Sequence, residues 1–181
     1  MPEVLPIVKL GHPILTEKAR DVEDVTDPWV QQLIDNMIAT YMDAEGLGIS
    51  GPQVNEGWRV FVISSHPCPL YPDAPHLTAT ALINPVILGR SKKKETDWEN
   101  CLSIPGIYGQ VPRHVWIKLA YTNREGRQVI KIFRNFLARV CQHEMDHLDG
   151  ILFLERIEPN ETFTKEEFQK KIGLKPIKIR A

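Results

Sequence analysis

The sequence predicts an α+β fold in which antiparallel sheets pack around one central helix. Apolar residues recur at helical spacing between Asp27 and Ala44, and several later segments have the apolar, turn-bounded pattern of strands. The chain has 181 residues, of which 43% are hydrophobic, so it is long enough and apolar enough to fill one core. We therefore expect a single domain spanning residues 1–181.

The first predicted helix runs from about Asp27 to Ala44, with Pro28 at an early helical position and Gly46 as its stop. The glycine-rich segment that follows is expected to be irregular or extended. Trp58 to Ser64 is predicted to be a strand. A surface loop is expected next, because prolines recur through it, at Pro67, Pro69, Pro72 and Pro75.

Further strands are predicted at 81–88, around Trp98, at 114–122 and at 127–133. The last two are joined by the turn-forming residues 123–126, which favours antiparallel pairing. Asn135 is then predicted to cap a short central helix that ends at Gly150. A last helix is expected to begin with a capping box formed by Thr164 and Glu167 and to stop near Gly173.

The charge balance gives no global sign of a nucleic-acid or membrane partner. The chain has 22 basic and 23 acidic residues, a net charge of -1, and no apolar run long enough to span a bilayer. Three cysteines, an odd number, argue against a disulfide framework and for a reducing compartment. With no signal peptide at the N-terminus, we expect a cytoplasmic protein that binds neither DNA nor membranes; an organelle matrix is the alternative if a transit peptide has been removed.

The central helix carries the pattern HExxH at residues 143–147. His143 and His147, four positions apart, lie on one helix face and can converge on one metal ion, while Glu144 beside them can transfer a proton. A catalytic divalent metal usually takes three protein ligands and leaves one position to water. The sequence therefore predicts a central metal-binding helix whose third ligand comes from elsewhere.

Cys101 is the strongest candidate for the third ligand. In one metallopeptidase class the pattern continues to a third histidine, but Phe153 stands at that position here. In another class a downstream glutamate serves, and the candidates Glu166 and Glu167 lie among lysines that favour a solvated helix. Cys101 interrupts an apolar stretch, and a thiolate binds Zn(II) or Fe(II) well. Cys141, two positions before His143, is expected to point to the far side of the helix as core filler.

Three segments in order resemble the motifs of the peptide deformylases, which are roughly GφGφAAxQ, EGCLS and QHExDH, with φ apolar. Here they are GLGISGPQ at 46–53, ENCLS at 99–103 and QHEMDH at 142–147. The resemblance spans nearly the whole chain. It departs from the motifs at Ser50 and Gly51, in place of two alanines, and at Asn100, in place of glycine. Asparagine tolerates φ > 0 better than most residues, so Asn100 is expected to keep the same backbone conformation at some cost.

The resemblance implies a single catalytic domain that hydrolyses the formamide on the N-terminal methionine of nascent polypeptides and releases formate. Cys101, His143 and His147 would hold the metal, which lowers the pKa of a water in its fourth position, and Glu144 would act as general base and then acid. By resemblance, the side-chain amide of Gln53 and the backbone N–H of Leu102 stabilise the oxyanion. The resemblance also implies Fe(II) as the physiological ion, with Zn, Ni or Co in purified protein.

Other residues are assigned to substrate and partners. Gly46, Leu47 and Gly48 are expected to line a cleft in which the peptide lies as an added strand, because missing side chains let two backbones approach. Val140, one turn before His143, is expected to wall the methionine pocket. Glu99 and Arg113 are interpreted either as a pair that orients a histidine or as an ordinary ion pair. The basic tail, with Lys170, Lys171, Lys175, Lys178 and Arg180, suits contact with ribosomal RNA, although a solvated terminus explains it more simply.

Two rival functions remain open from the residues. The first is a metallopeptidase that cuts internal amide bonds. The second is a deformylase-like protein that has lost turnover and binds peptide ends or a partner, as the departures at Ser50, Gly51 and Asn100 would allow.

Overall fold

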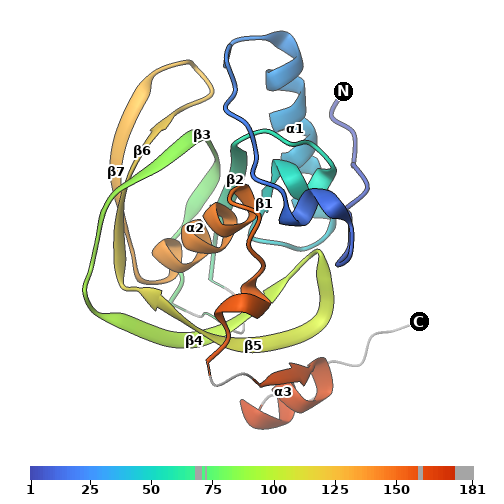
Figure 1. The fold of residues 1–181 in the computed structure, drawn as a ribbon, viewed down its shortest axis with the longest axis vertical. Coiled ribbons are helices and arrows are strands. Elements are labelled where there is room, and N and C mark those ends of the chain that lie inside the picture. Colours follow the sequence, from blue (N-terminus) through green and yellow to red (C-terminus); the bar gives the residue numbers. More distant parts are fainter. Residues whose placement is uncertain (68–70, 72, 159–160, 174–181) are drawn as a thin grey trace.

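The computed structural model describes residues 1–67, 71, 73–158 and 161–173 (Figure 1). The predicted α+β class is confirmed: within these residues, strands form two antiparallel sheets beside three α-helices. The helices are α1 (Pro28–Asp43), α2 (Asn135–Leu148) and α3 (Lys165–Lys171). The strands are β1 (Gly48–Ser50), β2 (Val60–Ser65), β3 (Leu77–Arg90), β4 (Lys94–Cys101), β5 (Ile104–His114), β6 (Trp116–Thr122), β7 (Gln128–Arg134) and β8 (Thr162–Thr164). Short 3₁₀ turns cover Pro13–Thr16, Gly51–Val54 and Phe153–Arg156.

The larger sheet has the order β1-β2-β3-β6-β7. Its strands pair antiparallel, and β1 at one edge pairs with β2 through Gly48 opposite Ile63. Since successive side chains of a strand point to opposite faces, β2 sends Val60 and Val62 to one side and Phe61 and Ile63 to the other, and all four are fully buried. The sheet is thus covered on both faces at β2.

The smaller sheet has the order β4-β5-β8 and is built on a hairpin. Cys101 at the end of β4 lies opposite Ile104 at the start of β5, so the hairpin closes through residues 102–103. The register shifts between Glu99 and Cys101, which leaves Asn100 in a bulge. The pairing of Cys101 with Ile104 therefore determines the position of Cys101 at the hairpin tip.

Helix α2 lies between the two sheets, which Figure 1 shows as the orange helix near the centre of the molecule. Its apolar face, Ala138, Cys141, Met145 and Leu148, packs against the larger sheet. Its other face turns toward β5 and the smaller sheet. Burying a large apolar side chain contributes about 1.5–3 kcal/mol, so this packing fixes the rotation of the helix and with it the direction of its polar face.

Helix α1 covers the opposite face of the larger sheet. It begins as predicted: Pro28 is the first helical residue, and the Asp27 carboxylate accepts a hydrogen bond from the Trp29 N–H at 2.8 Å. Its buried residues pack against Ile49 of β1 and against Val60 and Val62 of β2. The first motif is thereby held between α1 and the sheet. Among the described residues, no helix is long and apolar enough to cross a membrane.

One strand was not predicted, and one prediction about the elements is wrong. No element was predicted for most of the long strand β5, which contains Pro105, Gly106, Gly109 and Pro112; a Cβ on Gly109 would lie 2.4 Å from Ile157 Cδ1, so close packing explains that glycine. Asn135 does not cap α2: it is the first helical residue, with φ of 50°, and Arg134 occupies the cap position without a side-chain hydrogen bond.

The last helix is confirmed, since Thr164 and Glu167 form the reciprocal capping box. The strands predicted at 58–64, 81–88, around Trp98, 114–122 and 127–133 all exist with shifted ends, and β1 occupies part of the segment expected to be irregular or extended. Pro69 and Pro72 of the expected loop, and Lys175, Lys178 and Arg180 of the basic tail, lie outside the described residues.

Candidate metal centre

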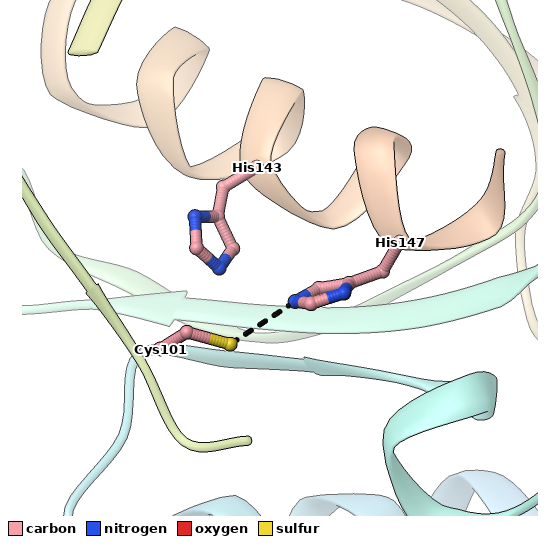
Figure 2. Close-up of side chains that lie close together, drawn as sticks. All are labelled: Cys101, His143 and His147. Atoms are coloured by element: carbon pink, nitrogen blue, oxygen red, sulfur yellow. Dashed lines mark hydrogen bonds between the residues drawn. The ribbon is translucent and has the colours of Figure 1, made fainter. Parts of the chain in front are cut away.

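Cys101, His143 and His147 lie together between α2 and the hairpin tip (Figure 2). One ligand atom from each, the thiol sulfur and a nitrogen of each ring, lies within 4.8 Å of the others, and Cys101 Sγ is 3.2 Å from His147 Nε2. The two histidines project from the polar face of α2, and Cys101 reaches them from the end of β4. The structure thus brings together the three residues that the sequence assigns to a metal.

The alternatives for the third ligand lie elsewhere. Phe153 stacks beside His143 with ring centroids 6.0 Å apart and fills space as an apolar neighbour. Glu167 is engaged in the capping box of α3, and Glu166 lies in the first turn of the same helix. Cys141 is buried in the core on the far side of α2, as expected.

The ring of His143 is held by Glu99. The Nδ1 atom lies 2.9 Å from Glu99 Oε2, so the ring presents its other nitrogen toward Cys101 and His147. Burial alone lowers the pKa of His143, but its hydrogen bonds with Cys101 and Glu99 raise it well above the ordinary value. A metal ion at this site must therefore displace a proton from His143.

Glu99 is also the centre of a buried ion network. Arg113 donates two hydrogen bonds of 2.9 Å to its carboxylate, and Arg139 donates a third of 2.8 Å. Burial raises the pKa of Glu99, but the bonds from Arg113 and His143 outweigh it and hold that pKa far below the ordinary value. Both interpretations offered for Glu99 and Arg113 hold, because the same carboxylate makes the ion pair and orients the histidine.

Arg139 and Asp146 complete this network. Arg139 also donates to the backbone carbonyls of Glu95 and Val111, each at 2.7 Å, and so ties α2 to both strands of the hairpin. Asp146, inside the HExxH pattern, accepts 2.5 Å and 3.0 Å bonds from Arg113 and Arg156. No role for Arg139 was predicted from the sequence, because its partners are backbone atoms and a distant carboxylate.

His147 is suited to bind a cation. Burial, the charge on His143 and the charge on Arg113 lower its pKa well below the ordinary value, so its ring is neutral and offers a lone pair. Its Nδ1 atom is buried without a hydrogen-bond partner among the described residues. One sulfur and two nitrogen ligands, converging in a buried place next to a cleft, fit the donor set of a catalytic zinc or ferrous site.

Glu144 lies next to these ligands and faces β1. The carboxylate is buried, its Oε2 atom has no hydrogen-bond partner among the described residues, and burial raises the pKa of Glu144 to about 7. A Cβ added at Gly48 would lie 2.9 Å from Glu144 Oε1. The glycine therefore makes room for the carboxylate, which is poised to exchange a proton near neutral pH.

Gln53 and Leu102, which the resemblance implies as donors to the oxyanion, both line the cleft beside the ligand cluster. The Nε2 atom of Gln53 lies 3.5 Å from Cys101 Sγ and 3.3 Å from Ser103 Oγ. Leu102 follows Cys101 in the hairpin turn, and its backbone N–H donates no hydrogen bond to any residue that the structure describes.

A cleft of about 1180 Å³ opens onto the cluster. Gly46, Leu47, Gly48 and Val140 all line it, as the sequence predicts. Its walls also include aromatic residues that the sequence prediction missed, namely Tyr71, Trp98, Tyr108 and Phe136. Phe136 precedes Val140 by four positions on α2, so helical spacing is the sequence signal by which it could have been predicted.

The three departures from the motifs have different surroundings. Ser50 is fully buried and its hydroxyl contacts Gln53. A Cβ at Gly51 would lie 2.7 Å and 2.8 Å from the backbone oxygens of Trp58 and Glu56, so this backbone admits only glycine without rearrangement. Asn100 is exposed and lines the cleft, and it does not have positive φ, so its backbone does not bear the cost expected of a left-handed conformation.

Known proteins resemble the chain in sequence and in structure. The family model for polypeptide deformylase matches residues 4–163. Peptide deformylase 2 of Nostoc sp. is 50% identical over 169 residues, which cover 93% of this chain and 94% of the relative. The crystal structure of a class I type b peptide deformylase from Acinetobacter baumannii with bound Met-Ala-Ser has 43% identity and a TM-score of 0.84, covering 87% and 100% of the two chains. That of peptide deformylase from Thermotoga maritima has 34% identity and a TM-score of 0.78, covering 87% and 99%.

Proposed function

Because the chain belongs to the peptide deformylase family, we propose that it removes the formyl group from the N-terminal formyl-methionine of nascent polypeptides. The observation that carries the proposal is the convergence of Cys101, His143 and His147 beside Glu144 at the floor of a cleft. The structural relative from Acinetobacter baumannii holds a peptide that begins with methionine, which supports the same specificity here. The products are formate and a free amine.

The chain's own residues account for the proton transfers. A divalent ion held by Cys101, His143 and His147 supplies positive charge that lowers the pKa of water and polarises a carbonyl. Glu144, with a pKa raised to about 7 by burial, accepts the proton of the attacking water and passes a proton to the departing amine nitrogen.

The oxygen of the formyl group gains negative charge during the attack, and Gln53 Nε2 and the Leu102 N–H donate to it. Removing one such donor typically costs about 2.7–4 kcal/mol of transition-state stabilisation. The peptide that follows the formyl group lies along the free edge of β1, beside Gly46 and Gly48, which line the cleft. The methionine side chain fills the apolar part of the cleft beside Val140, Phe136 and Tyr71.

We propose Fe(II) as the physiological ion. One thiolate and two imidazoles suit both zinc and ferrous iron, and the family resemblance favours iron. Zinc, nickel or cobalt is expected to replace it in protein purified in air, because a thiolate-ligated ferrous centre loses activity on oxidation. Metal analysis after anaerobic purification tests this, and an iron-loaded sample no faster than the zinc form contradicts it.

The decisive experiment measures formate release from formyl-Met-Ala-Ser, with metal content determined on the same sample. Matched substrates are acetyl-Met-Ala-Ser and a blocked peptide with only internal amide bonds. Formate from the first substrate alone supports the proposal, whereas cleavage of the internal bonds favours a metallopeptidase. If the wild type and Glu144→Gln are equally inactive while both bind metal and peptide, a binding protein without turnover is the better explanation.

Association with the ribosome through the basic tail stays a prediction, because residues 174–181 lie outside the described part of the chain. Salt-sensitive binding to ribosomes that is lost on removing the tail supports it.

A further inference from the structure

The hydroxyl of Ser50, one of the departures from the family motif, touches the proposed oxyanion donor Gln53. Ser50 is fully buried and is the N-cap of the 3₁₀ turn Gly51–Val54 that follows β1, and Gln53, 1% exposed, lies inside that turn. The carbonyl oxygen of the Gln53 side chain accepts two hydrogen bonds from this single residue: one from the Ser50 backbone N–H at 2.9 Å and one from its hydroxyl at 3.0 Å. Both acceptor positions of the amide oxygen are therefore filled.

These bonds determine which way the Gln53 amide faces. A backbone N–H can only donate, so the oxygen must lie on the Ser50 side and the NH₂ group on the side of Cys101 and Ser103. Ser103 Oγ, 3.3 Å from Nε2, holds one of the two N–H bonds. The other N–H points toward Cys101 Sγ, where an oxygen of the substrate must bind in the proposed function.

We propose that Ser50 is a positioning residue for catalysis: its hydroxyl adds a second hydrogen bond that holds the Gln53 amide oxygen and strengthens Nε2 as a donor to the oxyanion. A second hydrogen bond to the amide oxygen draws electron density from the nitrogen, and bonds in such a chain reinforce one another in a buried site. An alanine at this position keeps the backbone bond but loses the hydroxyl bond. The inference rests on the proposed function, in which Gln53 stabilises the transition state.

The test compares Ser50→Ala in two backgrounds, wild type and Gln53→Ala, using formyl-Met-Ala-Ser and metal-loaded protein. In the wild-type background kcat is expected to fall about fivefold with KM unchanged, the effect of one net hydrogen bond. In the Gln53→Ala background the same substitution is expected to leave kcat unchanged. Ser91→Ala is the matched control, because Ser91 is buried and its hydroxyl contacts Lys93 O, away from the site.

A second measurement does not depend on turnover. In metal-free protein the side-chain NH₂ signal of Gln53, identified by its loss in Gln53→Ala, is expected to shift in the ¹H–¹⁵N spectrum of Ser50→Ala and to stay in place in Ser91→Ala. A purely structural role for Ser50 predicts equal effects on kcat in both backgrounds, and that result overturns the inference.

Two other outcomes separate the inference from the proposed function. If Gln53→Ala lowers kcat but Ser50→Ala does not, the inference alone is overturned. If Gln53→Ala itself leaves kcat unchanged, the proposed role of Gln53 fails and the inference fails with it.

Discussion

Replacing Glu99 by glutamine tests the buried network that supports His143. The Glu99 side chain is 5% exposed and pairs with Arg113 and Arg139, whose side chains are 6% and 9% exposed. Glutamine has nearly the same shape but no charge, so two guanidinium groups lose their shared anion while staying buried. Breaking a buried ion pair by removing one partner costs about 3–5 kcal/mol. Arg113 keeps Asp146 and Arg139 keeps its backbone carbonyls, so we expect the lower end of that range.

The matched control is Glu95→Gln on the same strand. Glu95 pairs with Lys93 at 2.7 Å, but the two side chains are 54% and 71% exposed. Exposed pairs contribute at most about 1 kcal/mol, so this variant should retain nearly all of the stability. Urea unfolding of the metal-free proteins, followed by tryptophan fluorescence and far-UV circular dichroism, gives the free energies of unfolding.

The two variants should also differ in metal binding. Glu99 orients the His143 ring, and loss of such a partner typically lowers metal affinity about 10–100-fold, whereas Glu95 touches no ligand. If Glu99→Gln loses no more stability and no more metal affinity than Glu95→Gln, our account of the network is wrong.

Four further outcomes are expected. Glu144→Gln should lower kcat by about 10²–10⁴ while keeping its metal, and normal turnover in a metal-loaded sample would contradict the role of Glu144 as the base. Gly48→Ala should lower activity, because the added methyl displaces the Glu144 carboxylate; Gly57→Ala, with nothing within 4 Å, is its control and should match wild type in the same assay. Gly51→Ala should lower the free energy of unfolding by about 1–3 kcal/mol in urea, because its Cβ meets two backbone oxygens, and wild-type stability would show that the turn adapts. Metal affinity should weaken as the pH falls, because the pKa of His143 is raised and protons compete with metal for its ring; unchanged metal content after dialysis at pH 8 and at pH 5.5 would refute this.

The elements that the sequence predicts well are those whose signals are local. The spacing of Val30, Leu33, Ile34 and Met37 defines α1, and the Thr164–Glu167 capping box defines the start of α3. Strand β5 was missed because Gly109 and the two prolines fit a turn in isolation, whereas packing under Ile157 and pairing with β4 and β8 make it a strand. Tertiary contacts determine whether such a segment forms a strand or a turn, and these contacts cannot be read from the local sequence.

Some residues of the candidate site can likewise be predicted from local sequence, whereas others become evident only in the folded structure. HExxH predicts one helix face from its spacing alone, but the approach of Cys101, 42 positions before His143, follows only from the ordered motifs or from the hairpin in the structure. The partners of Arg139 are backbone carbonyls, so no pattern of side chains points to them. Tyr71, Trp98, Tyr108 and Phe136, which line the cleft, come from four separate segments that pack together only in the folded chain.

The ligand cluster joins the tip of a hairpin to the C-terminal half of a helix that packs mainly against the other sheet. A metal bound there would therefore cross-link the β4–β5 hairpin to α2. The unfolded chain has no such cross-link, because its three ligands do not lie together. Free metal at 100 times its dissociation constant would add about 2.7 kcal/mol to the unfolding free energy. The stability of the folded protein would then depend on the concentration of free metal. Removing the metal with a chelator would release the hairpin tip from α2, while the packing of α2 against the larger sheet would remain.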